Sequence, residues 1–264
     1  MPELPDVEVF RRYFDRHAGG KDVLEAEVYD TRCLEDVSKS SFERRLAGTT
    51  FGRSMRRGKQ MFVRLGADHW LTLHYGMTGY LVHAAEDEEE PDYTRVAFRL
   101  AGGGALYYVL KRMLGRVGLT DSPEQFADDK ELGPDAFDLS GADFRELLAS
   151  VRGKVKSLLM NQARLAGIGN IYSDEMLFQA GIHPDSECRS LDDSARRRLD
   201  EARLAVLRAA IDRQADPDAM PGDWLLPHRD DGATCPKCGG TIRRVVISGR
   251  GAYLCEGHQK TYSR

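Results

Sequence analysis

The feature that most constrains how this chain folds is a pair of short cysteine motifs near its carboxyl end. Cys235 and Cys238 are separated by two residues, and Cys255 and His258 repeat that spacing after sixteen intervening residues. Two ligands from each of two turns is typical of a zinc ribbon, and three thiolates with one imidazole form a closed tetrahedral site. We therefore predict one structural Zn²⁺ ion on these four residues. The alternative is a redox-active Cys-x-x-Cys with His258 as a bystander.

The segment between the two cysteine motifs has the pattern of a β-hairpin. Residues 241–254 predict two strands around Ser248-Gly249-Arg250-Gly251. Because so small a hairpin has little core of its own, we expect its folding to depend on the metal. Its tip presents Arg250 among small residues.

The rest of the chain changes character near its middle. Residues 2–17 predict a helix, and from about 22 to 110 the pattern is one of short strands, with a hairpin turn at 101–104. Gly133-Pro134 then precedes helical spacing at 141–151, 155–163, 171–180 and 193–214. We predict a β-rich domain over 1–132, a helical domain over 133–230 and the zinc hairpin over 231–264.

Composition excludes several classes of protein. The 264 residues are 41% hydrophobic and 30% charged, which argues against disorder, and they contain no apolar run long enough to cross a bilayer. The amino-terminal residues have acids and no apolar core, unlike a signal peptide. Cys33 and Cys188 stand alone, as reduced cysteines of an intracellular protein do. We expect a cytoplasmic monomer with no membrane partner.

The net charge of −4 argues mildly against a nucleic-acid partner. The excess acid is concentrated in residues 86–92 and 121–138, whereas 53–64, 111–116 and 152–164 are basic without any acid. One interpretation is that these runs are ordinary solvated faces. The other is that the basic segments fold onto one anionic ligand, with the acid kept elsewhere.

A glycine-containing turn precedes the third of the predicted helices in the second half. Gly167 and Gly169 lead into Asn170, and glycines before a helix leave backbone N–H groups free to meet a phosphate. With Lys154, Lys156 and Arg164 nearby, the turn predicts a phosphate cradle. The alternative is an ordinary capped helix with a tight turn.

Several longer strings carry a resemblance to a known family. They occur in one order along the chain: MPELPDVE, RRGKQMF, HYGMTGYL, ELGPDAF, LMNQARLAGIGNIYSDEMLFQAGIHP and the zinc hairpin with GRGAYLC. Together they resemble the formamidopyrimidine-DNA glycosylase and endonuclease VIII family from residue 2 to about 260. The PELP start and HYGMTG look more like the formamidopyrimidine branch.

The resemblance implies an α+β multidomain fold. Its parts are an N-terminal β-sandwich with a leading helix and a C-terminal helix-two-turn-helix domain with a zinc-finger β-hairpin, with DNA bound in the cleft between the domains. It also implies base excision: a damaged base in double-stranded DNA is flipped out, its glycosidic bond is broken, and the strand is cut at the abasic site.

The resemblance assigns the chemistry to four residues. Pro2 becomes a free secondary amine if Met1 is removed, and an α-amino pKa of about 8 leaves a useful fraction neutral near pH 7 for attack on the sugar C1′. Glu3 is similar to the family's proton donor to the deoxyribose oxygen. Lys59 matches a hairpin lysine that contacts phosphate and assists elimination, and Arg250 matches an arginine linked to the second elimination step.

The resemblance also implies a set of DNA-contacting residues. Met77 enters the space left by the flipped base, and Leu114 belongs to a companion loop, where Arg112 faces the orphaned base. For Met77 and Leu114 the alternative is core packing. The remaining positions either support the reaction or contact backbone phosphates: Asp6, His74, Arg152, Lys156 and Asn170.

Departures from the family pattern leave the lesion open. Asp6 replaces a glutamate, Leu114 a phenylalanine and His258 a cysteine, and Tyr93-Thr94-Arg95 stands where histidines often help to bind phosphate. Residues 215–234 are short where relatives that read 8-oxoguanine carry a lesion-capping loop. We expect an oxidised or ring-opened purine as substrate. The alternatives are oxidised pyrimidines, bulky adducts, or a relative that binds damage without cutting. A zinc-ribbon interaction module accounts for the tail alone.

Overall fold

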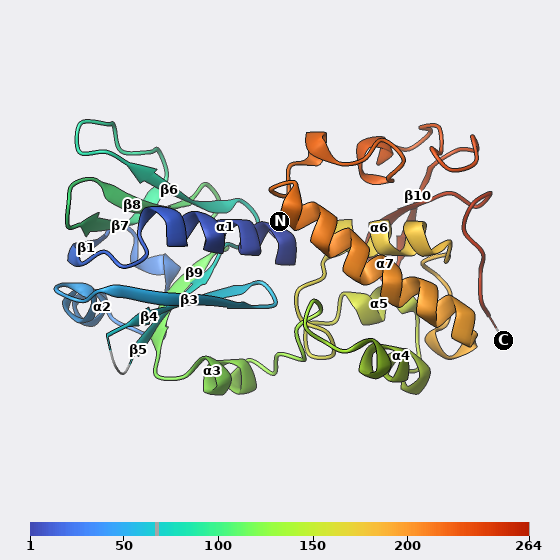
Figure 1. Ribbon diagram of the computed structural model, residues 1–264, viewed down its shortest axis with the longest axis horizontal. Helices are drawn as coiled ribbons and strands as arrows, with labels where there is room; N and C mark the ends of the chain where they lie inside the picture. Colours follow the sequence, from blue (N-terminus) through green and yellow to red (C-terminus); the bar gives the residue numbers. More distant parts are fainter. Residues whose placement is uncertain (67–68, 264) are drawn as a thin grey trace. The chain divides into compact units, whose positions relative to one another are not determined.

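A computed structural model describes residues 1–66 and 69–263, which form two compact units (Figure 1). One unit consists of Met1–Pro2 and Asp6–Lys130, and the other of Glu3–Pro5 and Glu131–Arg264. The zinc hairpin clusters with the helices in the second unit. The predicted α+β class is confirmed, whereas the domain boundaries at 132/133 and 230/231 stay predictions.

The first unit contains two sheets. One has the strand order β1-β7-β8-β6 and the other β2-β9-β5-β4-β3, with antiparallel neighbours apart from the parallel pair β2 and β9. The strands are β1 (Val23–Val28), β2 (Leu34–Glu35), β3 (Phe51–Arg57), β4 (Gln60–Leu65), β5 (His69–His74), β6 (Gly79–Ala84), β7 (Thr94–Leu100), β8 (Ala105–Leu110) and β9 (Arg116–Thr120).

Both sheets contribute to one apolar core, which makes the unit a sandwich. Phe98 from one sheet and Leu71 from the other are fully buried in the same cluster. The leading helix α1 (Leu4–His17) adds Val7 and Phe14 from one of its faces. The predicted hairpin turn at 101–104 is confirmed, since β7 and β8 pair directly across it.

Two helices of the first unit differ from the sequence prediction of strands and loops. Helix α2 (Lys39–Leu46) begins where the Ser38 side chain accepts a hydrogen bond from the Ser41 N–H, and α3 (Pro123–Asp129) begins in the same way at Ser122. Such caps satisfy amides that the first turn leaves without partners. The strand pattern predicted through 22–110 was therefore wrong over α2.

The second unit contains four further helices, all at predicted positions. They are α4 (Gly141–Ser150), α5 (Val155–Leu159), α6 (Asn170–Ala180) and α7 (Asp193–Asp212), followed by the strands β10 (Arg243–Ile247) and β11 (Arg250–Leu254). Short 3₁₀ turns occur at Thr31–Cys33, Cys188–Ser190, Pro217–Ala219 and Leu226–His228. Within the described residues, no helix is long and apolar enough to cross a membrane.

Helix α6 differs from the others because it is buried on nearly every side. Its apolar residues Met176 and Leu177 belong to the core of the second unit, yet Ser173, Asp174 and Glu175 in the same helix are also buried. Buried charged groups persist only where they are paired or hydrogen-bonded. The partners of these acids therefore indicate what α6 holds in place.

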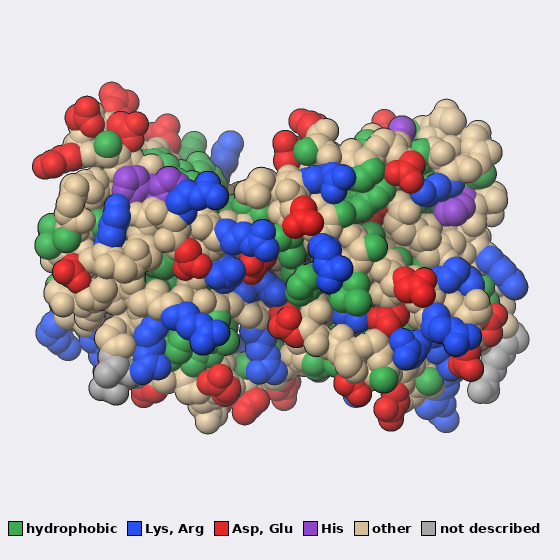
Figure 2. All heavy atoms as spheres, viewed as in Figure 1, with side chains coloured by type: hydrophobic (Ala, Val, Ile, Leu, Met, Phe, Trp, Pro, Cys, Tyr) green, Lys and Arg blue, Asp and Glu red, His purple; other side chains and the backbone are tan. Residues whose placement is uncertain are grey.

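The acidic run predicted to lie apart from the basic segments is on the surface of the first unit. Figure 2 shows acidic side chains gathered over the loop between β6 and β7, and residues 86–90 are all exposed there. Part of the excess negative charge of the chain therefore lies in one exposed patch on this loop.

Candidate functional site

The Glu3 carboxylate takes the place of a helix cap at the start of α6. It is 1% exposed and accepts hydrogen bonds from the backbone N–H groups of Gly169 (2.6 Å), Ile171 (2.8 Å) and Tyr172 (3.3 Å). The first amides of a helix lack partners within it, and the helix dipole favours an anion at this end. The structure therefore fixes the predicted proton donor on a rigid element.

The two glycines before α6 are needed for the close approach of the amino terminus. A Cβ atom on Gly169 would lie 2.4 Å from the Glu3 side chain, and one on Gly167 would lie 2.6 Å from Leu4, at a positive φ of 117°. The Leu4 N–H also donates to the Gly167 carbonyl at 3.0 Å. A carboxylate of this chain therefore occupies the Gly169 amide, and the predicted contact of the turn with a phosphate stays a prediction.

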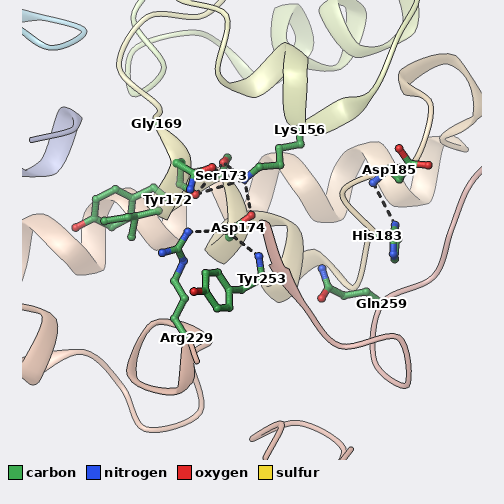
Figure 3. A network of polar contacts seen from close by, with 12 residues as sticks. Lys156, Gly169, Tyr172, Ser173, Asp174, His183, Asp185, Arg229, Tyr253 and Gln259 are labelled. Atoms are coloured by element: carbon green, nitrogen blue, oxygen red, sulfur yellow. Dashed lines mark hydrogen bonds and ion pairs between the residues drawn. The ribbon is translucent and has the colours of Figure 1, made fainter. Parts of the chain in front are cut away.

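A second buried acid of this unit, Asp174, has several polar partners (Figure 3). Its carboxylate accepts from Lys156 Nζ at 2.5 Å, from Arg229 Nη2 at 2.9 Å and from the Tyr253 N–H at 3.1 Å. Lys156 also donates to Ser173 Oγ at 3.1 Å. Burial lowers the pKa of Lys156 below its ordinary value, although the Asp174 charge opposes the shift.

These contacts place Lys156 in the interior. Its side chain is 1% exposed and its ammonium is paired inside the protein. Its predicted contact with a backbone phosphate stays a prediction. The interior position was not foreseen because its partner lies eighteen residues later in the chain.

Arg250 stands at the exposed tip of the zinc hairpin. The turn residues Ser248 and Gly249 have φ values of 49° and 77°, which is the geometry of a two-residue type I′ turn. Ser157 Oγ of α5 donates to Ser248 Oγ at 2.8 Å and fixes the tip. A cavity of about 440 Å³ lies beside it, lined by Lys156, Ser157, Met160, Asn161, Gln162, Ile247, Ser248 and Arg250.

The three cysteine sulfurs of the hairpin converge as a metal site requires. The Sγ atoms of Cys235, Cys238 and Cys255 all lie within 4.8 Å of one another, and those of Cys238 and Cys255 are 3.5 Å apart. Sulfurs on one tetrahedral zinc ion are about 3.8 Å apart. The donor set thus fits a structural zinc ion, as predicted.

His258 lies outside that group of three among the described residues. Its Nε2 is 2.8 Å from the Phe178 carbonyl oxygen, and its ring packs on Phe178. Because a carbonyl only accepts, this contact places the proton on Nε2 and leaves the Nδ1 lone pair for a metal. The fourth ligand stays a prediction.

In the first unit, Lys59 lies at the tip of the β3–β4 hairpin. Arg57 pairs with Gln60 across the turn, so Gly58 and Lys59 are its two loop residues. His74 at the end of β5 lies near this tip: burial lowers its pKa, and the charge of Lys59 adds to the shift. The Gly76 N–H donates to His74 Nδ1 at 3.3 Å. The neutral ring therefore carries its proton on Nε2, where it is able to donate to a phosphate oxygen.

Met77 and Leu114 lie on two loops that pack backbone to backbone. A Cβ atom on Gly76 would lie 2.4 Å from the Leu114 carbonyl carbon, and the Arg112 N–H donates to Thr78 Oγ1 at 3.2 Å. Met77 is 39% exposed and Leu114 is 47% exposed. Met113, next to Leu114, is partly buried against the core of the first unit. The alternative of core packing is therefore wrong for both tips.

The remaining predicted residues occupy varied positions. Arg112 and Arg152 are exposed, and Pro2 and Asp6 are partly buried at the start of the chain. Asn170 is the first residue of α6, and its Oδ1 is a buried atom without a hydrogen-bond partner in the described part of the chain. Their roles toward DNA stay predictions.

Sequence reasoning missed the residues that hold the second unit together. Asp174 collects the contacts described above, and Glu175 accepts from the N–H groups of Leu225 (3.2 Å) and Leu226 (2.8 Å). Arg229 covers the Tyr253 ring, with its guanidinium carbon 4.5 Å from the ring centroid. The signal was two adjacent acids inside an otherwise apolar helix, because such acids need buried partners.

Family models match three consecutive parts of the chain. Residues 1–117 match the formamidopyrimidine-DNA glycosylase N-terminal domain, and residues 132–218 match the formamidopyrimidine-DNA glycosylase H2TH domain. Residues 232–256 match a zinc finger found in FPG and IleRS. The last of these matches covers the three converging cysteines.

Whole-length relatives agree with these matches. Formamidopyrimidine-DNA glycosylases of Heliobacterium modesticaldum and Halorhodospira halophila are each 34% identical to this chain, covering 98% of it and 100% of the relative. A solved structure of Lactococcus lactis Fpg with DNA containing FAPY-dG has a TM-score of 0.89 at 28% identity, over 98% of this chain and 100% of that one. A second, with abasic-site DNA, has a TM-score of 0.88 at 27% identity over the same shares.

These proteins act in base excision, where glycosylase activity is combined with lyase activity at the abasic site. The matches extend from the strands that carry Lys59 to the hairpin that carries Arg250. The chain belongs to the formamidopyrimidine-DNA glycosylase family.

Proposed function

We propose that this chain removes a damaged base from double-stranded DNA through an iminium formed on the amine of Pro2, and then cuts the strand by elimination. The observation that carries the proposal is the Glu3 carboxylate, one residue after Pro2, buried and held by three amides at the start of α6. Pro2 and Glu3 are adjacent in the chain, so the nucleophile and the acid reach the same sugar.

The first step is displacement at the sugar. The neutral amine of Pro2 attacks C1′, the bond from C1′ to the base breaks, and the base leaves with the bonding electron pair; the proton lost from the Pro2 nitrogen neutralises the departing base. Glu3 donates a proton to the deoxyribose ring oxygen as the ring opens. The three amides and the helix dipole then stabilise the negative charge left on Glu3.

The later steps use the iminium as an electron sink. Loss of a C2′ proton expels the 3′ phosphate, and a second elimination expels the 5′ phosphate. Cations stabilise the leaving phosphates in such reactions. Lys59 at its hairpin tip and Arg250 at the zinc-hairpin tip are the cations that we assign to these two steps, with His74, Arg152 and the Asn170 amide as further phosphate contacts.

The two exposed loop tips supply the wedge that keeps the base out of the helix. An apolar side chain inserted between base steps partly unstacks them, and an adjacent arginine is able to meet the orphaned base. Met77 and Leu114 are the exposed apolar residues on the two packed loops, and Arg112 is exposed beside them.

The proposed substrate is an oxidised or ring-opened purine. The segment 215–234 packs against α6. Leu225 is fully buried, and Glu175 of α6 accepts hydrogen bonds from the Leu225 and Leu226 amides. So short and anchored a segment leaves little chain to cover a flipped base. We therefore expect weaker discrimination among lesions than in relatives with a long loop.

Oxidised pyrimidines are the second candidate substrate. A solved complex of Lactococcus lactis Fpg, 27% identical to this chain, holds DNA that contains an oxidised pyrimidine. A panel of duplexes with ring-opened guanine, 8-oxoguanine, a hydantoin and an oxidised pyrimidine ranks these possibilities by single-turnover excision rate. A strong preference for 8-oxoguanine over every other lesion would contradict the weak discrimination that we expect from the short segment 215–234.

The test of the mechanism is covalent trapping on abasic-site DNA with borohydride. We expect a trapped adduct from the wild type and none from Pro2→Gly. Intact-mass measurement on protein from its native host should find Pro2 as the first residue. Retained Met1 or a missing adduct would favour a relative that binds damage without cutting.

The metal and the cellular setting complete the proposal. His258 Nδ1 is the proposed fourth zinc ligand, and His258→Ala should lower the zinc affinity while Cys238→Ala abolishes binding, both measured by metal content. We propose a monomer that works on chromosomal DNA in the nucleoid. Light scattering and co-sedimentation with nucleoids test these two points.

A further inference from the structure

We propose that Asp174 is a positioning residue that attaches the strand of Arg250 to helix α6 and so sets the Arg250 guanidinium against the phosphate it binds. The inference rests on the assignment of Arg250 proposed above. Asp174 itself lies in the interior of its unit, and its side chain is 0% exposed.

Three separate elements meet at this one carboxylate (Figure 3). Lys156 comes from α5, Arg229 from the segment after the Leu226–His228 turn, and the Tyr253 N–H from β11. Two cations therefore share a single buried acid: Lys156 is 1% exposed and Arg229 is 19% exposed. Such clusters often add less stability than apolar packing would, so what they contribute is a defined geometry.

The contact to Tyr253 uses a backbone group that the hairpin leaves open. Ile247 and Arg250 pair next to the two-residue turn, and hydrogen-bonded pairs alternate along an antiparallel ladder. Tyr253, three residues after Arg250, therefore directs its N–H away from β10. Asp174 accepts that N–H, which fixes β11 to α6 along the strand.

Two further contacts hold the same strand. The Arg229 guanidinium lies over the Tyr253 ring at 4.5 Å, and Ser157 binds Ser248 at the turn. Ser157 of α5 therefore binds the tip of the hairpin directly, whereas its neighbour Lys156 is linked to the middle of the hairpin through Asp174. Asp174 is the group to which the Lys156 and Arg229 contacts both connect.

The same N-terminal part of α6 also binds Glu3. The carboxylate of the proposed acid binds the first amides of the helix, and Asp174 lies only one turn further along it. Glu3, Asp174 and Arg250 all belong to the same compact unit. The separation between the acid at the sugar and the cation at the phosphate is therefore set through one helix.

The test is a double-mutant cycle on the zinc-loaded, full-length protein. Binding to abasic-site duplex DNA is measured for the wild type, Asp174→Asn, Arg250→Ala and the double variant across a range of salt concentrations. Loss of one phosphate contact lowers the slope of log K against log salt by about 0.9. We expect both single variants to show that loss, and the double variant to match Arg250→Ala within about twofold.

Glu175→Gln is the matched control for this cycle. Glu175 is a buried acid on the same helix, but it binds the Leu225 and Leu226 amides rather than β11. Its effect should multiply with that of Arg250→Ala, because the two sites share no partner. Zinc content and thermal midpoint are recorded for every variant.

Two results would overturn the proposal. If the effects of Asp174→Asn and Arg250→Ala simply multiply, Asp174 does not act through Arg250. If Arg250→Ala alone leaves affinity and salt slope unchanged, the assignment of Arg250 itself fails, and that single variant identifies the case. Should Asp174→Asn not fold, Arg229→Met enters the same cycle, because it uncovers Tyr253 while keeping the Asp174–Lys156 pair.

Discussion

The two compact units present their proposed DNA-contacting residues in opposite ways. In the first unit they lie on loops: Lys59, partly buried, on a two-residue hairpin loop, and Met77 and Leu114, both exposed, on loops at the ends of strands. In the second unit the corresponding groups depend on charges buried beneath them. Glu3 is enclosed against α6, and the strand of Arg250 is attached to Asp174.

Because of this difference, substitutions in the two units should affect binding and stability differently. An exposed side chain such as Met77 or Leu114 buries little surface in its own domain, so a substitution there should change binding and leave folding intact. A buried ion pair that loses one partner leaves the other charge uncompensated. The first unit should therefore tolerate changes that alter specificity, whereas the second should respond to single changes with loss of both activity and stability.

The largest effect should come from the buried acid of the second unit. Glu3→Gln removes the transferable proton and places an amide N–H₂ against backbone donors, so base excision should fall by about 10²- to 10⁴-fold. Single-turnover excision on a lesion duplex measures it. Glu8→Gln is the control, on an acid of α1 that is 13% exposed and pairs with Arg11 and Arg12 rather than with α6, and it should stay within a few-fold of the wild type.

Removal of one buried cation should come next. Lys156→Met leaves the Asp174 carboxylate with Arg229 as its remaining cation, and we expect the free energy of unfolding to drop by about 3–5 kcal/mol. Lys154→Met is the matched control, since Lys154 pairs with Asp185 at the surface at 3.3 Å. That pair should contribute about 1 kcal/mol or less in denaturant titrations. Equal losses would remove the contrast between buried and exposed charges.

Glu175 should make the stability of the second unit depend on pH. Burial raises its pKa from 4.5 to about 7. Since the folded pKa is raised, the stabilisation from this group is complete below pH 4.5 and is lost as the pH rises through 7. The loss is on the order of 3 kcal/mol over that window. Relative to the wild type, Glu175→Gln should flatten the pH dependence of unfolding; an unchanged slope would assign the titration elsewhere.

The smallest effects should come from the exposed tips. Leu114→Phe enlarges the stacking area of the wedge, and each stacked base is worth about 1–3 kcal/mol. We expect tighter binding to lesion duplexes, weaker binding for Leu114→Ala, and unchanged thermal midpoints for both. A loss of unfolding free energy as large as the change in binding free energy would mean that Leu114 packs within its own domain.

The sequence predicted local elements better than it predicted their partners. The helices α4 to α7 and the zinc hairpin follow from spacing and glycine punctuation within a few residues. Helix α2 was missed because its short segment lies among strong strand patterns, and only its Ser38 cap distinguishes it. Local pattern is enough where an element is defined by its own periodicity.

The contacts at the site that the sequence did not predict have a different cause. The glycine turn at 167–169 has the composition of an anion site, and it does bind an anion, but the anion is Glu3 from 166 residues away. Lys156 has the composition of a surface cation, and its burial depends on Asp174. Both outcomes follow from contacts between distant segments, which no local pattern specifies.

The contact between Glu3 and α6 also has a consequence for the timing of synthesis. The amides that bind Glu3 are translated 166 residues or more after it, roughly 10–30 s later at bacterial rates. Throughout that interval the partners of the amino terminus do not yet exist. The amino terminus of the nascent chain therefore stays accessible during that interval, which is when we expect an aminopeptidase to remove Met1 and free the amine of Pro2, before folding encloses Glu3.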